Sequence, residues 1–298
     1  MRIKFLLVLI TVWAGITAFA QDDDLFNRLQ GISVNRVNYF NVDGIEIISQ
    51  TKPVAFNAKS IGKNFRHLKI NEKELVVSDS SFAFPNFYLL KTEENVKGLK
   101  SNNSYYFIED KDKNVTSVVF GSVNKVDKEF ERRFVLLLRD NAIPDSVFNS
   151  FKPDSINFAG RGILLGGACQ WMGVNNIQCP GNGQMNWSVH KTPEDAAKAV
   201  DDQFLRIASA NKGKIVSDST VTVIFEGSEI TARKIIYDFK GIGSVITGMS
   251  GAKTLTVYFV AAPVRGYFVS CVMSFWNNDR INPDGLAPLL GEVMQLKN

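Results

Sequence analysis

The stretch that decides the fold is Val221–Phe239, which reads VTVIFEGSEITARKIIYDF. Apolar side chains occupy every second position from Val221 to Phe225, which is the period of a strand with one buried face. Gly227-Ser228 supplies a two-residue hairpin turn, and the chain then returns as a second β-rich run. Strands joined by so short a turn must be antiparallel. The stretch therefore predicts an antiparallel sheet.

Further strands extend this sheet in both directions along the chain. Residues 162–172 and 184–190 are predicted strands on the N-terminal side, and residues 255–261 continue the alternation on the C-terminal side. A turn at residues 263–266 leads into a strand ending at Trp276, one face of which is wholly apolar around Cys271. Cys271 is therefore expected to be a small buried hydrophobic residue.

Two amphipathic helices are expected to pack on the sheet. Thr192 is a suitable N-cap and Pro193 a suitable first residue for a helix that runs toward Gly213. A second helix is predicted after Asn282, with a leucine-rich face up to Leu296. The order of strands, helix, four strands and helix predicts an α+β domain. This order resembles the Mog1/PsbP-like fold in topology alone, and such a resemblance implies no function.

The N-terminal half shows the same β-rich character. A hairpin is predicted around Asp43-Gly44, and a second one joins residues 105–108 to residues 115–120. Apolar residues then recur at helical spacing over residues 126–138. The following segment contains Pro144 and Pro153 without a clear period, which indicates a boundary near Ser150. We therefore expect two domains, residues 21–149 and 150–298.

Residues 1–20 have the three parts of a secretory signal peptide. Arg2 and Lys4 precede an apolar run, and Ala18-Phe19-Ala20 is a small-residue cleavage motif. We expect cleavage after Ala20, no membrane span afterwards, and a secreted or periplasmic protein. The chain has 34 basic and 30 acidic side chains, so its charge gives no reason to expect nucleic acid as a partner.

The chain has three cysteines, and an oxidising compartment favours one disulfide among them. Since Cys271 is expected in the core, Cys169 and Cys179 are the favoured pair. The two histidines, His67 and His190, are too few for a common zinc site, and we expect neither a metal nor another cofactor. A Cys169/His190 nucleophilic pair remains an alternative, but a disulfide would remove the thiolate.

Other catalytic motifs fail on their spacing or context. Gly248–Ala252 differs from the GxSxG motif of a nucleophile elbow at one residue. A β-rich run follows it where the elbow needs a helix, so a loop is expected there. A carboxylate-based hydrolase stays open, because the 30 acidic residues cannot be ranked without geometry. We therefore predict a binding or interaction protein rather than an enzyme, with a secreted hydrolase as the alternative.

The segment from Gln170 to Trp187 combines indoles with uncharged amides. Amides offer donors and acceptors without charge, and indoles offer a flat apolar face. We predict Trp171, Trp187, Gln170 and Asn186 as ligand-binding residues for a carbohydrate, a polar peptide or another envelope protein. The competing interpretation places both indoles in the core, where Trp is usually found.

Overall fold

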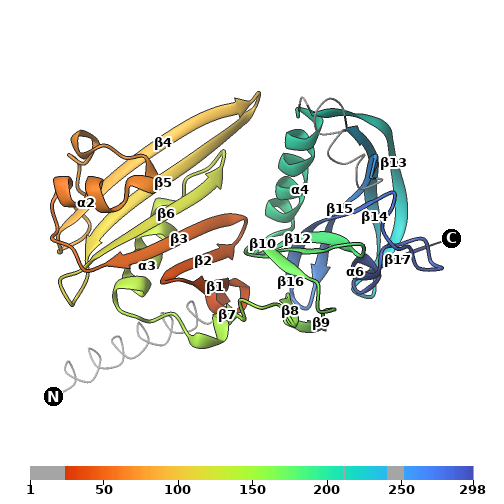
Figure 1. The fold of residues 1–298 in the computed structure, drawn as a ribbon, viewed down its shortest axis with the longest axis horizontal. Helices are drawn as coiled ribbons and strands as arrows, with labels where there is room; N and C mark the ends of the chain where they lie inside the picture. The colour runs from red at the N-terminus through yellow and green to blue at the C-terminus, as the bar shows by residue number, and fades with distance from the viewer. Residues whose placement is uncertain (1–23, 211, 240–251, 298) are drawn as a thin grey trace, which may run out of the picture.

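The computed structural model describes residues 24–210, 212–239 and 252–297. The predicted signal peptide lies outside the described residues, and so does the predicted loop at residues 248–252 except for Ala252. Two sheets with separate hydrophobic cores make up most of the described chain (Figure 1). None of the described helices is long and apolar enough to cross a membrane.

The first sheet has seven strands in the order β4-β5-β6-β3-β2-β1-β7 and is antiparallel except for the β1–β7 pair. Its strands are β1 (Gln30–Val34), β2 (Val37–Val42), β3 (Ile45–Lys52), β4 (Asn86–Val96), β5 (Leu99–Glu109), β6 (Val115–Val123) and β7 (Phe148–Asn149). Helix α3 (Lys128–Arg139) packs on one face, where Phe134 contacts Phe40 and Phe120.

The opposite face of this sheet is partly covered by α2 (Ala58–Asn64) and two short 3₁₀ helices. Ile61 and Phe65 pack there against Phe107 of β5. These two 3₁₀ helices are η1 (Arg66–Leu68) and η2 (Glu72–Glu74). A third, η3 (Asp145–Val147), precedes β7.

The second sheet has eight antiparallel strands in the order β10-β11-β12-β16-β15-β14-β13-β17. Its strands are β10 (Gln170–Gly173), β11 (Asn176–Cys179), β12 (Gly183–His190), β13 (Gly213–Phe225), β14 (Ser228–Phe239), β15 (Thr254–Val264), β16 (Tyr267–Trp276) and β17 (Met294–Leu296). Helix α4 (Pro193–Ala208) lies on one face, with Phe204 against Phe259 (Figure 1). A separate hairpin, β8 (Ser155–Phe158) and β9 (Arg161–Leu164), packs on the other face with α6 (Pro288–Gly291).

Local chemistry explains the hairpins and the start of α4. Phe225 pairs with Ser228, so the turn residues are Glu226 and Gly227, one position earlier than predicted. Both have positive φ, at 48° and 84°, as a type I′ turn requires. The predicted turn at Asp43-Gly44 has the same conformation. Thr192 caps α4 by accepting a hydrogen bond from the Asp195 backbone N–H, as predicted.

Two predicted elements were wrong. The strand expected over residues 162–172 is divided between β9 and β10, which belong to different sheets. The helix expected up to Leu296 is only the single turn α6, after which the chain extends as β17 and pairs with β13. Leu286, Leu289 and Leu290 of the predicted helical face are still buried, but the open edge of β13 supplies backbone partners that end the helix.

The two sheets meet where the β2–β3 turn touches β12. The Asp43 backbone N–H donates to the Val189 carbonyl at 3.0 Å, and the Gly44 N–H donates to Ser188 Oγ at 2.9 Å. Arg28 holds the Asp43 carboxylate with a hydrogen bond of 3.0 Å from Nε. Ser188 Oγ also donates to Asn41 Oδ1 at 2.6 Å, so the contact is polar and uses both main-chain and side-chain atoms.

Candidate functional site

Uncharged polar side chains form a row across four neighbouring strands of the eight-stranded sheet. Gln170 lies opposite Gln178, which lies opposite Gln184, which in turn lies opposite Ser274. Directly paired residues of antiparallel strands share one face of the sheet. We call these four residues the glutamine row. It lies on the face that carries α4, because Val257, the next cross-strand neighbour, packs beneath that helix.

The side chains that alternate with the glutamine row on the same strands face the core. Ile177, Met185 and Trp187 are fully buried in the cluster that also contains Cys271. Alternation of the side chains therefore separates the segment into an amide face and an apolar face.

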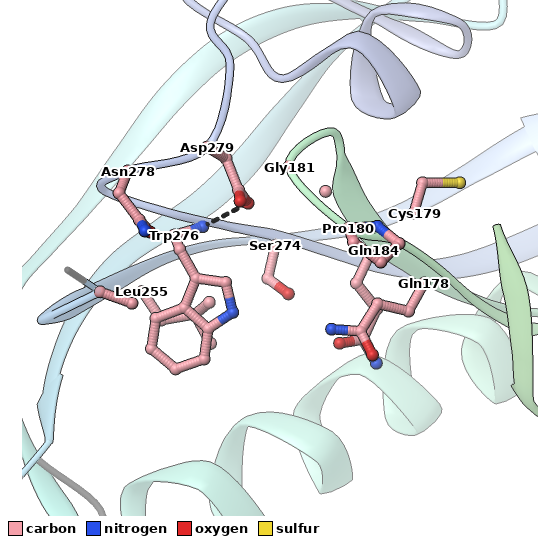
Figure 2. A pocket seen from close by; sticks show the side chains of 12 residues that line it. Gln178, Cys179, Pro180, Gly181, Gln184, Leu255, Ser274, Trp276, Asn278 and Asp279 are labelled. Carbon is pink, nitrogen blue, oxygen red and sulfur yellow. Dashed lines mark hydrogen bonds between the residues drawn. The ribbon is translucent and has the colours of Figure 1, made fainter. Parts of the chain in front are cut away.

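Three members of the glutamine row, Gln178, Gln184 and Ser274, line a cavity of about 460 Å³. Figure 2 shows the Trp276 indole on one side of Ser274 and the amides of Gln178 and Gln184 on the other. Leu255 lies beside the indole, opposite Trp276 in the β15–β16 pair. The cavity thus sets an aromatic surface against hydrogen-bonding groups, which is the composition typical of small-molecule sites.

Neighbouring groups hold the cavity walls in place. The Trp276 ring packs against Phe239 with 5.1 Å between ring centroids, and the Trp276 N–H donates to Asp279 Oδ2 at 2.8 Å. Gly183 has a φ of 104°, and a Cβ at this position would lie 2.8 Å from Leu290 Cδ1. A larger residue there would displace the start of β12 and with it Gln184.

The cavity carries little charge. Among its described lining residues, Asp279 has the single carboxylate, and this group already accepts the Trp276 backbone N–H. The other polar lining side chains are amides and a hydroxyl. Such groups can donate to and accept from hydroxyls or amides of a ligand without requiring a counter-charge.

A disulfide fixes the wall formed by the end of β11. Cys169 and Cys179 are bonded, with their Cα atoms 4.1 Å apart, which agrees with the predicted pair. Cys179 lines the cavity, so the bond ties this wall to the residue that precedes β10. Cys271 is a buried free thiol whose pKa is raised by burial.

The predicted ligand-binding residues do not lie together. Gln170 and Asn186 lie on the amide face, whereas Trp171 and Trp187 are directed to the core face. Trp187 is 1% exposed and packs against Phe158. Trp171 is half-buried, and its Nε1 donates to the Ser150 carbonyl at 3.0 Å.

Sequence reasoning missed Trp276, the indole that does line the cavity. Two patterns could have identified the arrangement. Asn176–Cys179 and Gln184–Val189 alternate polar and apolar residues, which predicts strands and separates the amides from Trp187. Trp276 and Cys271 are an odd number of residues apart on β16, so their side chains lie on opposite faces and Trp276 lies on the amide face.

The alternative Cys169/His190 catalytic pair is not formed. Cys169 is in the disulfide, and His190 is buried with its Nε2 2.8 Å from Ser270 Oγ. Burial lowers the pKa of His190. In the part of the chain that the structure describes, no group of three or more His, Cys, Asp or Glu could hold a metal ion.

A buried carboxylate with a shifted pKa lies elsewhere, between α3 and the seven-stranded sheet. Burial raises the pKa of Glu131, whose Oε2 accepts a hydrogen bond from the Tyr106 hydroxyl at 3.1 Å. Lys128 Nζ donates to the same hydroxyl at 2.9 Å, and burial lowers the pKa of Lys128. Because these groups are partners of one another, we interpret the cluster as an attachment of α3 to the sheet.

Asp79 forms a second ion pair on this side of the molecule. Arg132 contacts its carboxylate through Nε at 2.8 Å and Nη2 at 3.0 Å. Burial alone would raise the pKa of Asp79, but the hydrogen bonds from Arg132 and Ser81 outweigh it and lower the pKa to about 2. This carboxylate is therefore ionised and fully engaged at neutral pH.

Comparisons with known proteins add no functional assignment. No protein-family model matches the chain, and no curated protein matches it. A solved structure, that of the di-domain ARO/CYC StfQ from the steffimycin biosynthetic pathway, is similar over 89% of this chain and 77% of that chain, with 10% identity and a TM-score of 0.17. Similarity this low supports no argument about fold or function.

Proposed function

We propose that this protein is a non-enzymatic binding module for an uncharged, hydroxyl-rich ligand of the carbohydrate class. The observation that carries the proposal is the cavity in which the Trp276 indole faces Gln178, Gln184 and Ser274. The apolar face of an indole can stack on the C–H face of a sugar ring. The amides and the hydroxyl can exchange hydrogen bonds with the sugar hydroxyls.

The chemistry of the cavity supports binding over hydrolysis. Glycoside hydrolysis usually needs two carboxyl groups on either side of the scissile bond. Asp279 is the single carboxylate among the described lining residues, and it is hydrogen-bonded to the Trp276 backbone. A neutral lining also favours a neutral ligand, because a charged one would lose hydration without gaining an opposite charge.

We propose that the protein acts outside the cytoplasm after cleavage following Ala20, in a secreted or periplasmic location. The tripartite pattern of residues 1–20 supports this. Mass spectrometry of the mature N-terminus tests it, and a product that retains Met1 would contradict it. The domain boundary near Ser150 and the Mog1/PsbP-like arrangement of the C-terminal half stay predictions, and the binding proposal does not depend on either.

The test of function compares two indoles of one sheet. Isothermal titration of neutral glycans against the full chain should identify a binder, and Trp276→Ala should weaken it at least about tenfold through loss of stacking and buried area. Trp171→Ala is the matched control, because this half-buried indole lies on the opposite face. The proposal fails if no glycan binds, if polar peptides bind instead, or if Trp276→Ala leaves the affinity unchanged.

A further inference from the structure

The polar row does not stop at the cavity. Beyond Gln184 and Gln178 it continues to Gln170 on β10, which is an edge strand of the eight-stranded sheet. The Gln170 side chain is exposed. Neighbouring strands lie about 4.8 Å apart, so the row extends roughly 14 Å from Ser274 to Gln170.

A second pair of amides runs beside the row. Asn176 and Asn186 lie opposite each other on β11 and β12. Each is two residues away from the row's glutamine on its own strand, which is a distance of about 7 Å. Gln184 Nε2 donates to Asn176 Oδ1 at 2.9 Å, and Gln203 of α4 donates to Asn186 Oδ1 at 3.4 Å. These hydrogen bonds orient the amides next to the row and hold them on the sheet surface.

The outer members of the row have unused hydrogen-bonding capacity. Neither the Gln170 amide nor the Gln178 amide is hydrogen-bonded to a side chain or carbonyl of the described residues. Each amide can donate two hydrogen bonds and accept two. All members of the row and of the neighbouring pair are uncharged, so a polyanionic chain finds no counter-charge among them.

We propose that the site takes a linear oligomer of neutral sugars rather than a single sugar. The first unit occupies the cavity between Trp276 and the amides of β12 and β11, and the following units continue along the glutamine row toward β10. The chain leaves the protein at the open edge of the sheet beside Gln170. This inference rests on the proposed function and specifies the size and direction of its ligand.

The experiment measures affinity against chain length. The full chain is titrated with β-1,4-linked oligomers of glucose and of N-acetylglucosamine, from one to six units. Affinity should rise with each added unit until the oligomer spans the row and should then level off. Gln170→Ala should weaken binding of the longest oligomer about three- to tenfold, as expected for one lost hydrogen bond, and leave the shortest binder unchanged.

The matched control is Gln295→Ala. Gln295 is an exposed glutamine on β17, the opposite edge strand of the same sheet, and its loss should change no affinity. If Trp276→Ala abolishes binding but affinity is equal for all lengths, the inference fails and the proposed function stands. If affinity rises with length but Gln170→Ala has no effect, the proposed path is wrong. If no oligomer of either series binds, both are overturned.

Discussion

The cluster under α3 and the amide face of the eight-stranded sheet use polar side chains in opposite ways. Between α3 and the seven-stranded sheet, Tyr106 and Glu131 are buried, and the partly exposed Lys128 donates a hydrogen bond to the Tyr106 hydroxyl, which in turn donates to Glu131. On the amide face of the eight-stranded sheet, Gln170 and Gln178 are uncharged, at least partly exposed and without side-chain partners among the described residues.

The difference follows from the cost of burial. A buried charge is tolerated only with a partner, so the cluster around Glu131 satisfies its own polar groups. A half-exposed amide keeps its water and needs no partner within the protein. The buried polar groups around Glu131 therefore stabilise the fold, whereas the outer amides of the glutamine row stay available to a ligand.

The largest expected effect separates Trp187, on the core face, from Trp276, which lines the cavity. Trp187→Ala should lower the free energy of unfolding by about 3–5 kcal/mol, because it removes a ring that is buried in the core. Trp276→Ala should cost much less, since its ring is only partly buried. Urea denaturation measures both. Equal losses would show that Trp276 is structural and would weaken the distinction between the two faces.

The next effect concerns the disulfide beside the cavity. Replacing both Cys169 and Cys179 by Ala should cost roughly 2–3 kcal/mol, because the bond restricts a short loop in the unfolded chain. Thiol counting in denaturant without reductant should give one free cysteine, Cys271. A count of three would contradict the assigned bond.

A smaller, pH-dependent effect is expected from the ion pair between Asp79 and Arg132. The pKa of Asp79 is depressed from 3.8 to about 2, so its stabilising contribution is present above about pH 4 and is lost as the pH falls toward 2. The contribution is about 2 kcal/mol at neutral pH. Asp79→Asn should lose this part of the acid dependence in denaturation curves recorded between pH 2 and 7. An unchanged pH profile would mean that the ion pair with Arg132 does not hold in solution.

The smallest effect on stability is expected on the amide face. Gln178→Ala should change the free energy of unfolding by no more than about 0.5 kcal/mol, as for other surface substitutions. The same variant should weaken glycan binding in titration calorimetry. A large loss of stability would show that the Gln178 amide supports the fold, as the cluster around Glu131 does.

Local chemistry made much of the fold predictable. The turn at Asp43-Gly44, the cap at Thr192 and the buried face around Cys271 each depend on a few adjacent residues, and the structure has all three. The end of the chain was not predictable in this way. β17 forms because β13, some 70 residues earlier in the sequence, offers an open edge, and no local pattern reports such a partner.

The candidate site was only half predictable for the same reason. Composition indicated a segment that contributes to the cavity, but the amides from it that line the cavity are Gln178 and Gln184, whereas the predicted Gln170 and Asn186 lie beside it. It did not identify the indole, because Trp276 reaches the cavity through the pairing of β12 with β16. Register places Ser274 opposite Gln184 and so brings Trp276 near, whereas Trp187, close in sequence, is turned away.

Strand β12 takes part in both the cavity and the contact between the sheets. Gln184 near its start lines the cavity, and Ser188 and Val189 near its end receive the β2–β3 turn. Any ligand that shifts β12 changes the free energy with which the Asp43-Gly44 turn docks. Thermodynamic reciprocity then requires that docking change ligand affinity by the same factor. The seven-stranded sheet, which makes no part of the cavity wall, would in that case act as an effector of the site.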